Sequence, residues 1–253
     1  MGSSVWVALA LSALAGLATT IGSVLGLIVR KPGPRFMALS LGFSAGVMVL
    51  VSFVELLPRG IGAAGFPAGM AAFFGGMVLM LLLDFLIPHQ YEGEKSDGLR
   101  KSGSPVLMRT GLLVALGIGI HNLPEGMAAF AGALQDVRLG VSIAVAIGIH
   151  NIPEGLAVSV PVYAATGSRK KAFTWSFLSG VTEPLGAGLG AFLLMPVLTP
   201  VVLGSVLAGV AGVMVFISFD ELVPVANSYG HEHVAIVGAI AGMMVMVLSL
   251  WLL

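Results

Sequence analysis

The sequence predicts an all-α integral membrane protein, a single transmembrane domain over residues 1–253 with eight transmembrane helices. Three observations predict this fold class. Of the 253 residues, 57% are hydrophobic and only 9% are charged, whereas a soluble domain carries about 25% charged residues. Apolar stretches long enough to cross a bilayer recur along the whole chain. The 35 glycines are typical of transmembrane helices whose backbones pack closely.

Polar interruptions divide the chain into eight apolar stretches of the roughly 20 residues that a helix needs to cross a bilayer. We expect helices at 5–29, 36–57, 67–87, 106–131, 139–163, 171–195, 200–224 and 233–253. The longest connection, 88–105, is rich in Gly, Ser and charge, so we expect a flexible cytoplasmic loop there.

Basic residues predict the orientation in the membrane. Ten of the 12 Lys and Arg residues flank the connections after the first, third and fifth stretches, and only Arg59 and Arg138 fall on the other side. Because basic residues mark cytoplasmic loops, we expect both termini outside the cytoplasm. The balance of 12 basic and 12 acidic residues offers no basic stripe for nucleic acid. The absence of Cys excludes disulfides and thiolate metal sites.

Two internal repeats run through the chain. The segment IGIHNLPEGMA at 118–128 recurs as IGIHNIPEGLA at 147–157 on the next predicted helix. In addition, 41–58 matches 207–224 at 11 of 18 positions, and the same offset continues into the helix that follows each copy. An odd number of crossings separates these two copies, so they have inverted topology. Inverted repeats are a frequent feature of secondary transporters, although a duplicated membrane enzyme or scaffold has the same pattern.

Acidic residues lie inside the predicted helices without basic partners. Seven of the 12 acids are there, whereas the only basic residues there are Arg109 and Lys171, both near helix ends. An ionised carboxylate in hydrocarbon needs a neutralising charge. The simplest counter-ion is a metal cation or protons. The seven acids are Glu55, Asp84, Glu125, Glu154, Glu183, Asp220 and Glu221.

The repeated H-N-x-P-E-G motif has spacing that favours metal. His121, Asn122 and Glu125 fall on one face of a helix, so imidazole, amide and carboxylate groups converge. Pro124 removes an N–H and is expected to open the helix beside His121. Two copies offer ligands for one divalent ion or for a bridged pair of ions. The second copy consists of His150, Asn151 and Glu154, with Pro153.

Glu183 is the third expected carboxylate of this site. It lies near the middle of the predicted helix 171–195, and His121 and His150 have similar depths in their own helices. Pro184 follows it, and Thr182 offers a neighbouring hydroxyl. The alternative interpretation of the motif residues is a pair of helix kinks whose polar groups satisfy one another.

Two further groups of acids lie near the mouths of the bundle. Glu55 is expected near the outer mouth, and Asp220 and Glu221 near the cytoplasmic mouth, all at C-terminal helix ends. They suit relay sites on either side of a central one, although hydrated interfacial acids explain them equally well. Asp84 has no counterpart in the repeat and is expected at an interface. His89, His231 and His233 are expected to be solvated loop residues.

These motifs resemble the ZIP (Zrt/Irt-like) family of divalent metal transporters, in its bacterial ZupT/GufA-type branch. The residues that carry the resemblance are H-N-L-P-E-G, H-N-I-P-E-G, T-E-P-L-G and two copies of S-F-x-E-L-x-P. The resemblance covers all eight predicted helices. It implies a 3+2+3 arrangement, in which the fourth and fifth helices lie between inverted triplets, and a homodimer in the cell's inner or plasma membrane. One departure is the 88–105 loop, which has a single His where many relatives are histidine-rich.

The resemblance also implies the substrate and the ligands. The substrate is zinc, and often iron, manganese, cobalt or cadmium, carried into the cytoplasm; the metal is cargo, and no cofactor is implied. One ion is expected at His121, Glu125, His150 and Glu154, and a second at Asn122, Glu125, Asn151, Glu154 and Glu183.

The expected mechanism is transport. A cation enters past Glu55, binds at the central site, and leaves past Asp220 and Glu221 after the two halves rearrange. Exchange of protons for metal makes uptake pH-sensitive, with affinity falling below about pH 6. An intramembrane metal-dependent hydrolase is the main alternative, and a carrier that uses the carboxylates without metal is another; the sequence contains no hydrolase motif or phosphate loop.

Overall fold

The computed structural model describes residues 2–29, 33–86, 105–197 and 199–252. The predicted loop at 88–105 lies outside the described residues apart from Pro105, and so do His89 and several of the basic residues that set the predicted orientation. Every regular element in the described ranges is helical, as predicted.

The helices follow the predicted apolar stretches closely. Within the described residues, seven are long and apolar enough to cross a membrane, and α5, at 31 residues, corresponds to the remaining predicted one. The elements are α1 (Gly2–Val29), α2 (Pro34–Val51), a π-helical turn η1 (Ser52–Leu56), α3 (Leu57–Ala64), α4 (Phe66–Leu86), α5 (Pro105–Gln135), α6 (Val137–Thr166), α7 (Arg169–Leu194), a short 3-10 turn η2 (Met195–Val197), α8 (Pro200–Ile217), a second π-helical turn η3 (Ser218–Leu222), α9 (Val223–Ser228) and α10 (Glu232–Leu252).

Local chemistry sets the helix ends. The Asp136 side chain accepts a hydrogen bond from the Arg138 N–H and begins α6, and Ser168 and Thr199 cap α7 and α8 in the same way. At the other end, α6 stops at Gly167, whose φ of 63° is left-handed and therefore suits glycine. One residue therefore separates α5 from α6, and two residues separate α6 from α7.

Two π-helical turns correct the prediction that Glu55 and Glu221 lie at helix ends. Both S-F-x-E-L-x-P copies form such a turn, and each helix continues beyond it, so α2, η1 and α3 together run to Ala64 rather than to 57. Pro58 supplies no N–H, and the Leu57 N–H instead reaches back five residues to the Ser52 carbonyl. The Ser52 hydroxyl donates to the carbonyl four residues earlier at 2.7 Å. The sequence therefore builds one wide turn into each helix.

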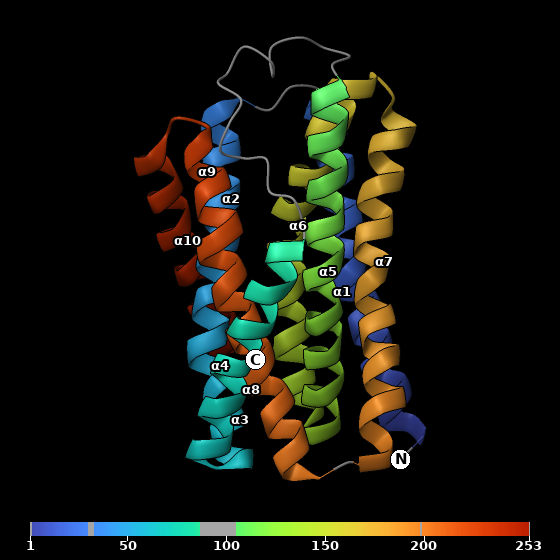
Figure 1. Ribbon diagram of the computed structural model, residues 1–253, viewed down its shortest axis with the longest axis vertical. Helices are drawn as coiled ribbons and strands as arrows, with labels where there is room; N and C mark the ends of the chain where they lie inside the picture. Colours follow the sequence, from blue (N-terminus) through green and yellow to red (C-terminus); the bar gives the residue numbers. More distant parts are fainter. Residues whose placement is uncertain (1, 30–32, 87–104, 198, 253) are drawn as a thin grey trace.

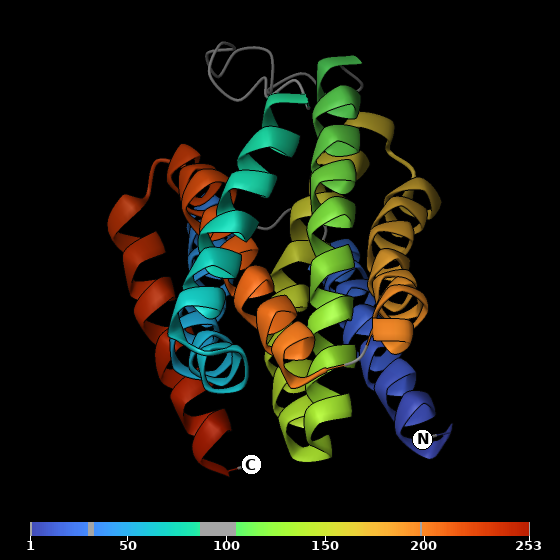
Figure 2. The same ribbon diagram turned by 60° about the horizontal axis from the view of Figure 1, so that its bottom comes forward.

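The helices form two groups that lie side by side in Figure 1. The motif group consists of α1, α5, α6 and α7, in which α1 packs on α6 and α5 packs on α7. The second group, here called the flanking group, consists of α2, α3, α4, α8, α9 and α10, in which α2 packs on α10 and α4 packs on α8. Figure 2, turned by 60°, again shows the two groups side by side, with α8 next to α5. Contacts of α2 with α6 and of α5 with α8 join them.

Glycines hold each group together. A Cβ at Gly46 would lie 2.0 Å from the Ala239 carbonyl oxygen, and one at Gly212 would lie 1.9 Å from that of Phe73. These helices therefore touch backbone to backbone, as small residues permit in membranes. Among the described glycines, every one whose added Cβ would come within 3.0 Å of a neighbouring helix meets a helix of its own group. Close glycine contacts, here called glycine locks, therefore hold the helices within each group. The seam, which is the interface between the two groups, has no such contact among the described glycines.

The packing groups are not the sequence repeats. Residues 41–58 and 207–224 belong to the same group, and α1 and α7 both belong to the other. Each half of the chain therefore contributes helices to both groups. The expected rearrangement was between the two halves of the sequence, whereas the units that pack together are the motif group and the flanking group.

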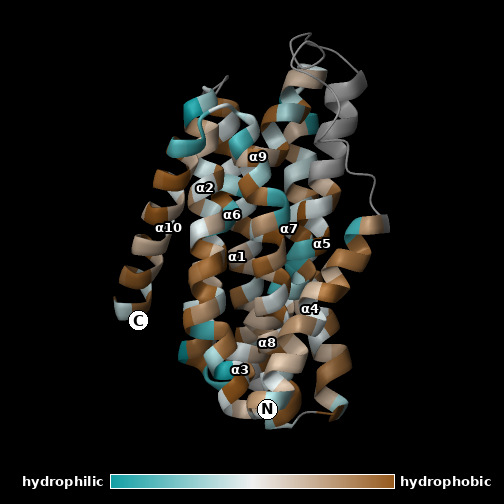
Figure 3. Ribbon diagram, turned by 60° about the vertical axis from the view of Figure 1, so that its left-hand side comes forward, coloured by the Kyte–Doolittle hydropathy of each residue, from teal (hydrophilic) through white to brown (hydrophobic). Residues whose placement is uncertain are grey.

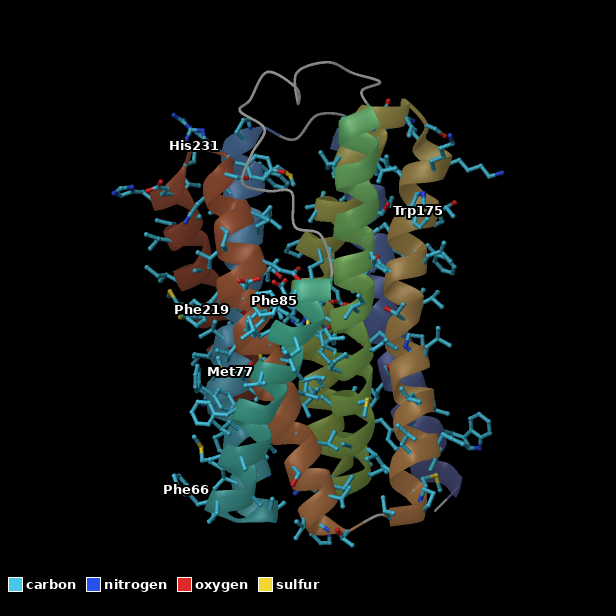
Figure 4. All side chains as sticks on the ribbon, in the orientation of Figure 1. Phe66, Met77, Phe85, Trp175, Phe219 and His231 are labelled. Atoms are coloured by element: carbon cyan, nitrogen blue, oxygen red, sulfur yellow. The ribbon has the colours of Figure 1, made fainter. Side chains whose placement is uncertain are left out.

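Apolar side chains cover the outer surface. Phe66, Phe85 and Phe219 are each more than 60% exposed, and Figure 4 shows them on the ribbon of α4 and η3. Along most of α4 and α10 the ribbon is hydrophobic, and hydrophilic residues gather toward the helix ends (Figure 3). A surface of this kind needs lipid around it, which agrees with an integral membrane protein.

Candidate metal site

The two H-N-x-P-E-G motifs meet in the core of the motif group. All six polar motif side chains are fully buried. Contrary to expectation, α5 and α6 continue through Pro124 and Pro153 as uninterrupted helices. The polar side chains are His121, Asn122 and Glu125 on α5 and His150, Asn151 and Glu154 on α6.

The two helices exchange their histidine partners. His121 Nε2 lies 3.2 Å from Glu154 Oε2, and His150 Nε2 lies 3.2 Å from Glu125 Oε1. Each imidazole therefore pairs with the carboxylate of the opposite helix, whereas the sequence spacing pointed to convergence within one helix. The crossed pairs bring all four side chains into one cluster.

The asparagines are oriented by backbone carbonyls. Asn122 Nδ2 donates to the Ser179 carbonyl at 2.9 Å, and Asn151 Nδ2 donates to the Ala15 carbonyl at 3.1 Å. Because the amide nitrogens face these acceptors, the orientation of each amide is determined by its surroundings. Both Oδ1 atoms remain available as acceptors or ligands.

Glu183 of α7 joins the cluster through α6. Its Oε2 accepts a hydrogen bond from Asn151 Nδ2 at 2.7 Å, and the side chain is fully buried. Thr182, expected to add a hydroxyl to the site, instead donates to the carbonyl of Ser179 in its own helix at 2.6 Å. The structure thus links six of the predicted residues through side-chain pairs, whereas Asn122 is held by the Ser179 carbonyl of α7.

Seven buried nitrogen and oxygen atoms of the cluster have no hydrogen-bond partner. Buried polar atoms are nearly always paired, so such a concentration needs an explanation. Imidazole nitrogen with carboxylate and amide oxygen is a donor set that suits divalent cations. The atoms are His121 Nδ1, Asn122 Oδ1, Glu125 Oε2, His150 Nδ1, Asn151 Oδ1, Glu154 Oε1 and Glu183 Oε1.

In the described part of the chain, the side chains as they stand form no group of three or more His, Asp or Glu that is arranged to hold a metal ion. Each Nε2 faces a carboxylate of the opposite helix, so the Nδ1 atoms are the imidazole nitrogens left without a partner.

The relay acids occupy unequal positions. A Cβ on Gly117 would lie 3.5 Å from Glu221 Oε2, so this carboxylate reaches α5 one helical turn from His121. Asp220, its neighbour, is exposed. Glu55 instead pairs with Arg59 at 3.3 Å, and their side chains are 15% and 53% exposed. Only Glu221 among the predicted relay acids lies close to the central cluster.

A family model described as ZIP Zinc transporter matches residues 88–250, which is more than half of the chain. The chain belongs to the ZIP family.

Full-length relatives of this ZIP chain are zinc transporters by name. A protein named zinc transporter ZupT from Chlorobium phaeovibrioides is 56% identical, with 97% of each chain covered. Those from Streptococcus mutans and Clostridium perfringens are 48% and 45% identical. The alignment covers 100% of this chain and 99% of the first, and 99% of this chain and 97% of the second.

Two interactions of this ZIP chain, one at the cluster and one at Glu55, were not predicted from the sequence. Ser44 of α2 is fully buried and donates to the His150 carbonyl at 3.2 Å, linking the flanking group to α6. Ser44 is a single polar residue in an apolar stretch and aligns with Val210 in the repeat. The sequence therefore gives no sign that Ser44 contacts the site. Arg59 was expected in a loop, but it lies in α3 and follows Glu55 by one turn, which is the spacing of a helical ion pair.

Proposed function

We propose that this ZIP chain transports divalent metal cations, zinc foremost, across the cell's inner or plasma membrane into the cytoplasm. The observation that carries the proposal is the cluster of seven unpartnered nitrogen and oxygen donors, buried in an apolar helical bundle. Buried acids without cationic side chains around them need a counter-ion, and a mobile divalent cation supplies it. The names of the relatives support zinc.

The ligand sets are those that the motifs favour. One ion would take His121, Glu125, His150 and Glu154, which already touch one another in crossed pairs. A second would take oxygen from Asn122, Glu125, Asn151, Glu154 and Glu183. With nitrogen and oxygen donors alone, iron, manganese, cobalt and cadmium are further candidate substrates.

We propose eight transmembrane helices with 3+2+3 connectivity, both termini outside the cytoplasm, and a homodimer. Support for the topology comes from the distribution of the basic residues and from the length of α5. Homodimer formation is the expectation from the family resemblance, and native mass spectrometry of the detergent-solubilised protein tests it.

Transport requires the cluster to open to each side in turn. The seam between the motif group and the flanking group is the place where such movement is easiest, because the glycine locks lie inside the groups. Glu221, from the flanking group, approaches α5 beside His121 and would receive the ion on its way to the cytoplasm. Glu55 would act at the outer mouth.

The chain is a transporter rather than an enzyme, as its relatives are by name. A hydrolase would need one water position held by protein ligands beside a single base. Two equivalent His/Asn/Glu sets favour a path for ions over a single reaction centre.

Uptake of radiolabelled zinc by proteoliposomes tests the function. We expect uptake by the wild-type chain, loss of uptake in Glu125→Ala, and retention in Glu232→Ala, which removes an exposed acid and serves as the matched control. Absence of uptake of zinc, manganese or iron by the wild-type chain would overturn the function. Wild-type uptake in Glu125→Ala would overturn the site while leaving the function in place.

A further inference from the structure

Helices α1 and α7 are the first helices of the two expected inverted triplets, and their sequences match once the packing gives the register. With an offset of 164 residues they share identical residues at seven positions, and the shared set is dominated by small residues. The pairs are Ala8/Ala172, Ser12/Ser176, Leu14/Leu178, Gly16/Gly180, Gly22/Gly186, Leu25/Leu189 and Gly26/Gly190.

The contacts of α1 with α6 reproduce those of α7 with α5. A Cβ on Gly22 would lie 1.9 Å from the Ile152 carbonyl oxygen, and one on Gly186 would lie 2.1 Å from that of Leu123. Ile152 and Leu123 are equivalent residues of the two H-N-x-P-E-G motifs. The motif group is therefore organised about a local twofold axis that exchanges α1 with α7 and α5 with α6.

Under this exchange Thr19 is the counterpart of Glu183. A Cβ on Gly155 would lie 1.9 Å from the Thr19 carbonyl oxygen, and one on Gly126 would lie 1.9 Å from that of Glu183. These glycines end the two motifs.

The side chains of this pair are equivalent as well. The Thr19 Cβ lies 3.2 Å from a Cβ built on Gly180, and the Glu183 Cβ lies 3.3 Å from one built on Gly16. The side chains of Thr19 and Glu183 therefore leave the backbone at equivalent positions, each facing the other helix of the α1/α7 pair.

The two positions differ in what they offer. Glu183 reaches Asn151 with one oxygen and leaves the other without a partner. Thr19 is fully buried, and its hydroxyl has no hydrogen-bond partner. The local axis relates Asn122 to Asn151, the residue that Glu183 contacts. Asn122, the counterpart expected beside Thr19, also has an unpartnered oxygen. A buried threonine would ordinarily bond to a nearby carbonyl, and the Thr19 hydroxyl, which makes no such bond, is free to contact a ligand.

We propose that Thr19 is a binding residue of the metal site, whose hydroxyl contacts the transported divalent cation, or a water of its hydration shell, on the side opposite Glu183. This inference rests on the proposed function. Threonine in place of a second glutamate limits the site to three carboxylates, from Glu125, Glu154 and Glu183. A hydroxyl is a neutral oxygen ligand, so it holds the ion without adding charge that would slow its release.

Equilibrium zinc binding by isothermal titration calorimetry on the detergent-solubilised full chain, together with proteoliposome uptake, tests the proposal. We expect Thr19→Ala to weaken zinc binding about threefold to tenfold, in the range of one lost hydrogen bond or oxygen ligand, and Thr19→Ser to retain wild-type binding. The matched control is Ser23→Ala, because Ser23 is one turn away, fully buried and also without a partner, and its counterpart Ala187 is already alanine. Binding by Thr19→Ala equal to that of Ser23→Ala would overturn the proposal.

An exchange of the pair gives a second test. Glu183→Thr is expected to lose at least about tenfold in zinc affinity, since it removes a carboxylate ligand. The double variant Thr19→Glu/Glu183→Thr is expected to recover most of that loss, because the local twofold axis places a carboxylate equivalently. No recovery in a double variant that melts like Glu183→Thr would overturn the equivalence of the two positions. Failure of the wild-type chain to bind or take up any divalent ion would instead overturn the proposed function.

Discussion

Substitution of Gly126 by Ala probes the helix contact on which the position of Glu183 depends. An added Cβ would lie 1.9 Å from the Glu183 carbonyl oxygen, a distance that real Cβ atoms essentially never show. To reach 3.0 Å, α5 and α7 must move apart by about 1.1 Å. The hydrogen bond from Asn151 Nδ2 to Glu183 Oε2, now 2.7 Å long, would then exceed the ordinary limit of about 3.2 Å if the displacement falls along it.

Both stability and uptake should respond to this displacement. Overpacking costs about 1–3 kcal/mol, which lowers the melting temperature of a chain this size by roughly 2–12 °C. In enzymes a 1 Å displacement of a functional group costs about 100-fold in rate, so we expect zinc uptake to fall by at least about tenfold. Thermal unfolding in detergent and proteoliposome uptake measure the two effects.

Gly188→Ala is the matched control because Gly188 lies on α7 and an added Cβ there meets no atom within 4 Å. This change should leave uptake intact and stabilise the helix by about 0.5–1 kcal/mol. If Gly126→Ala melts and transports like Gly188→Ala, the close contact between α5 and α7 does not position Glu183.

Three further predictions concern the route and the chemistry. Gly117→Ala should be tolerated, because the added Cβ would make an ordinary 3.5 Å contact with Glu221. Gly117→Leu should displace that carboxylate and lower uptake by about tenfold. Equal uptake by both variants would contradict a role for Glu221. Arg59→Gln should release Glu55 from its ion pair and lower the zinc KM by about twofold to fivefold, which corresponds to the energy of an exposed ion pair. Arg138→Gln removes an equal charge on the same predicted side and should leave the zinc KM unchanged. Uptake should fall as the pH is lowered, because protons compete with metal for imidazole nitrogen. A flat profile from about pH 5 to 8 would exclude histidine ligation.

The helical fold was predictable because each transmembrane helix requires a long run of apolar residues, which is visible in the sequence. The predicted stretch 67–87 became α4 at Phe66–Leu86, and 139–163 became α6 at Val137–Thr166. The π-helical turns were not predicted, and the helix of Glu55 was ended too early at 57. In a membrane, a helix gains more from keeping its backbone hydrogen-bonded through a wide turn than from ending before Pro58.

The residues of the candidate site were predictable, but their pairing was not. A repeated spacing of His, Asn and Glu places three side chains on one face of each helix whatever the neighbours are. Which carboxylate faces which imidazole depends on the rotation of α5 against α6. The crossed pairs at 3.2 Å follow from that rotation, and no sequence spacing contains it.

The family resemblance implies that α1 and α7 correspond, but their residue-by-residue match is not recognisable without the structure. Its identities are mainly Gly, Ala and Ser, the commonest residues of any tightly packed membrane helix, so the pattern is indistinguishable from composition in the sequence alone. What makes the repeat visible is geometry, because Gly22 and Gly186 meet equivalent carbonyls at nearly the same distance. Small residues fix where two backbones touch, and the touching backbones fix where the side chains beside them point. Thr19 therefore shares a position with Glu183 without sharing any chemistry that an alignment would score, and its role in the site can be inferred only after the helices are packed.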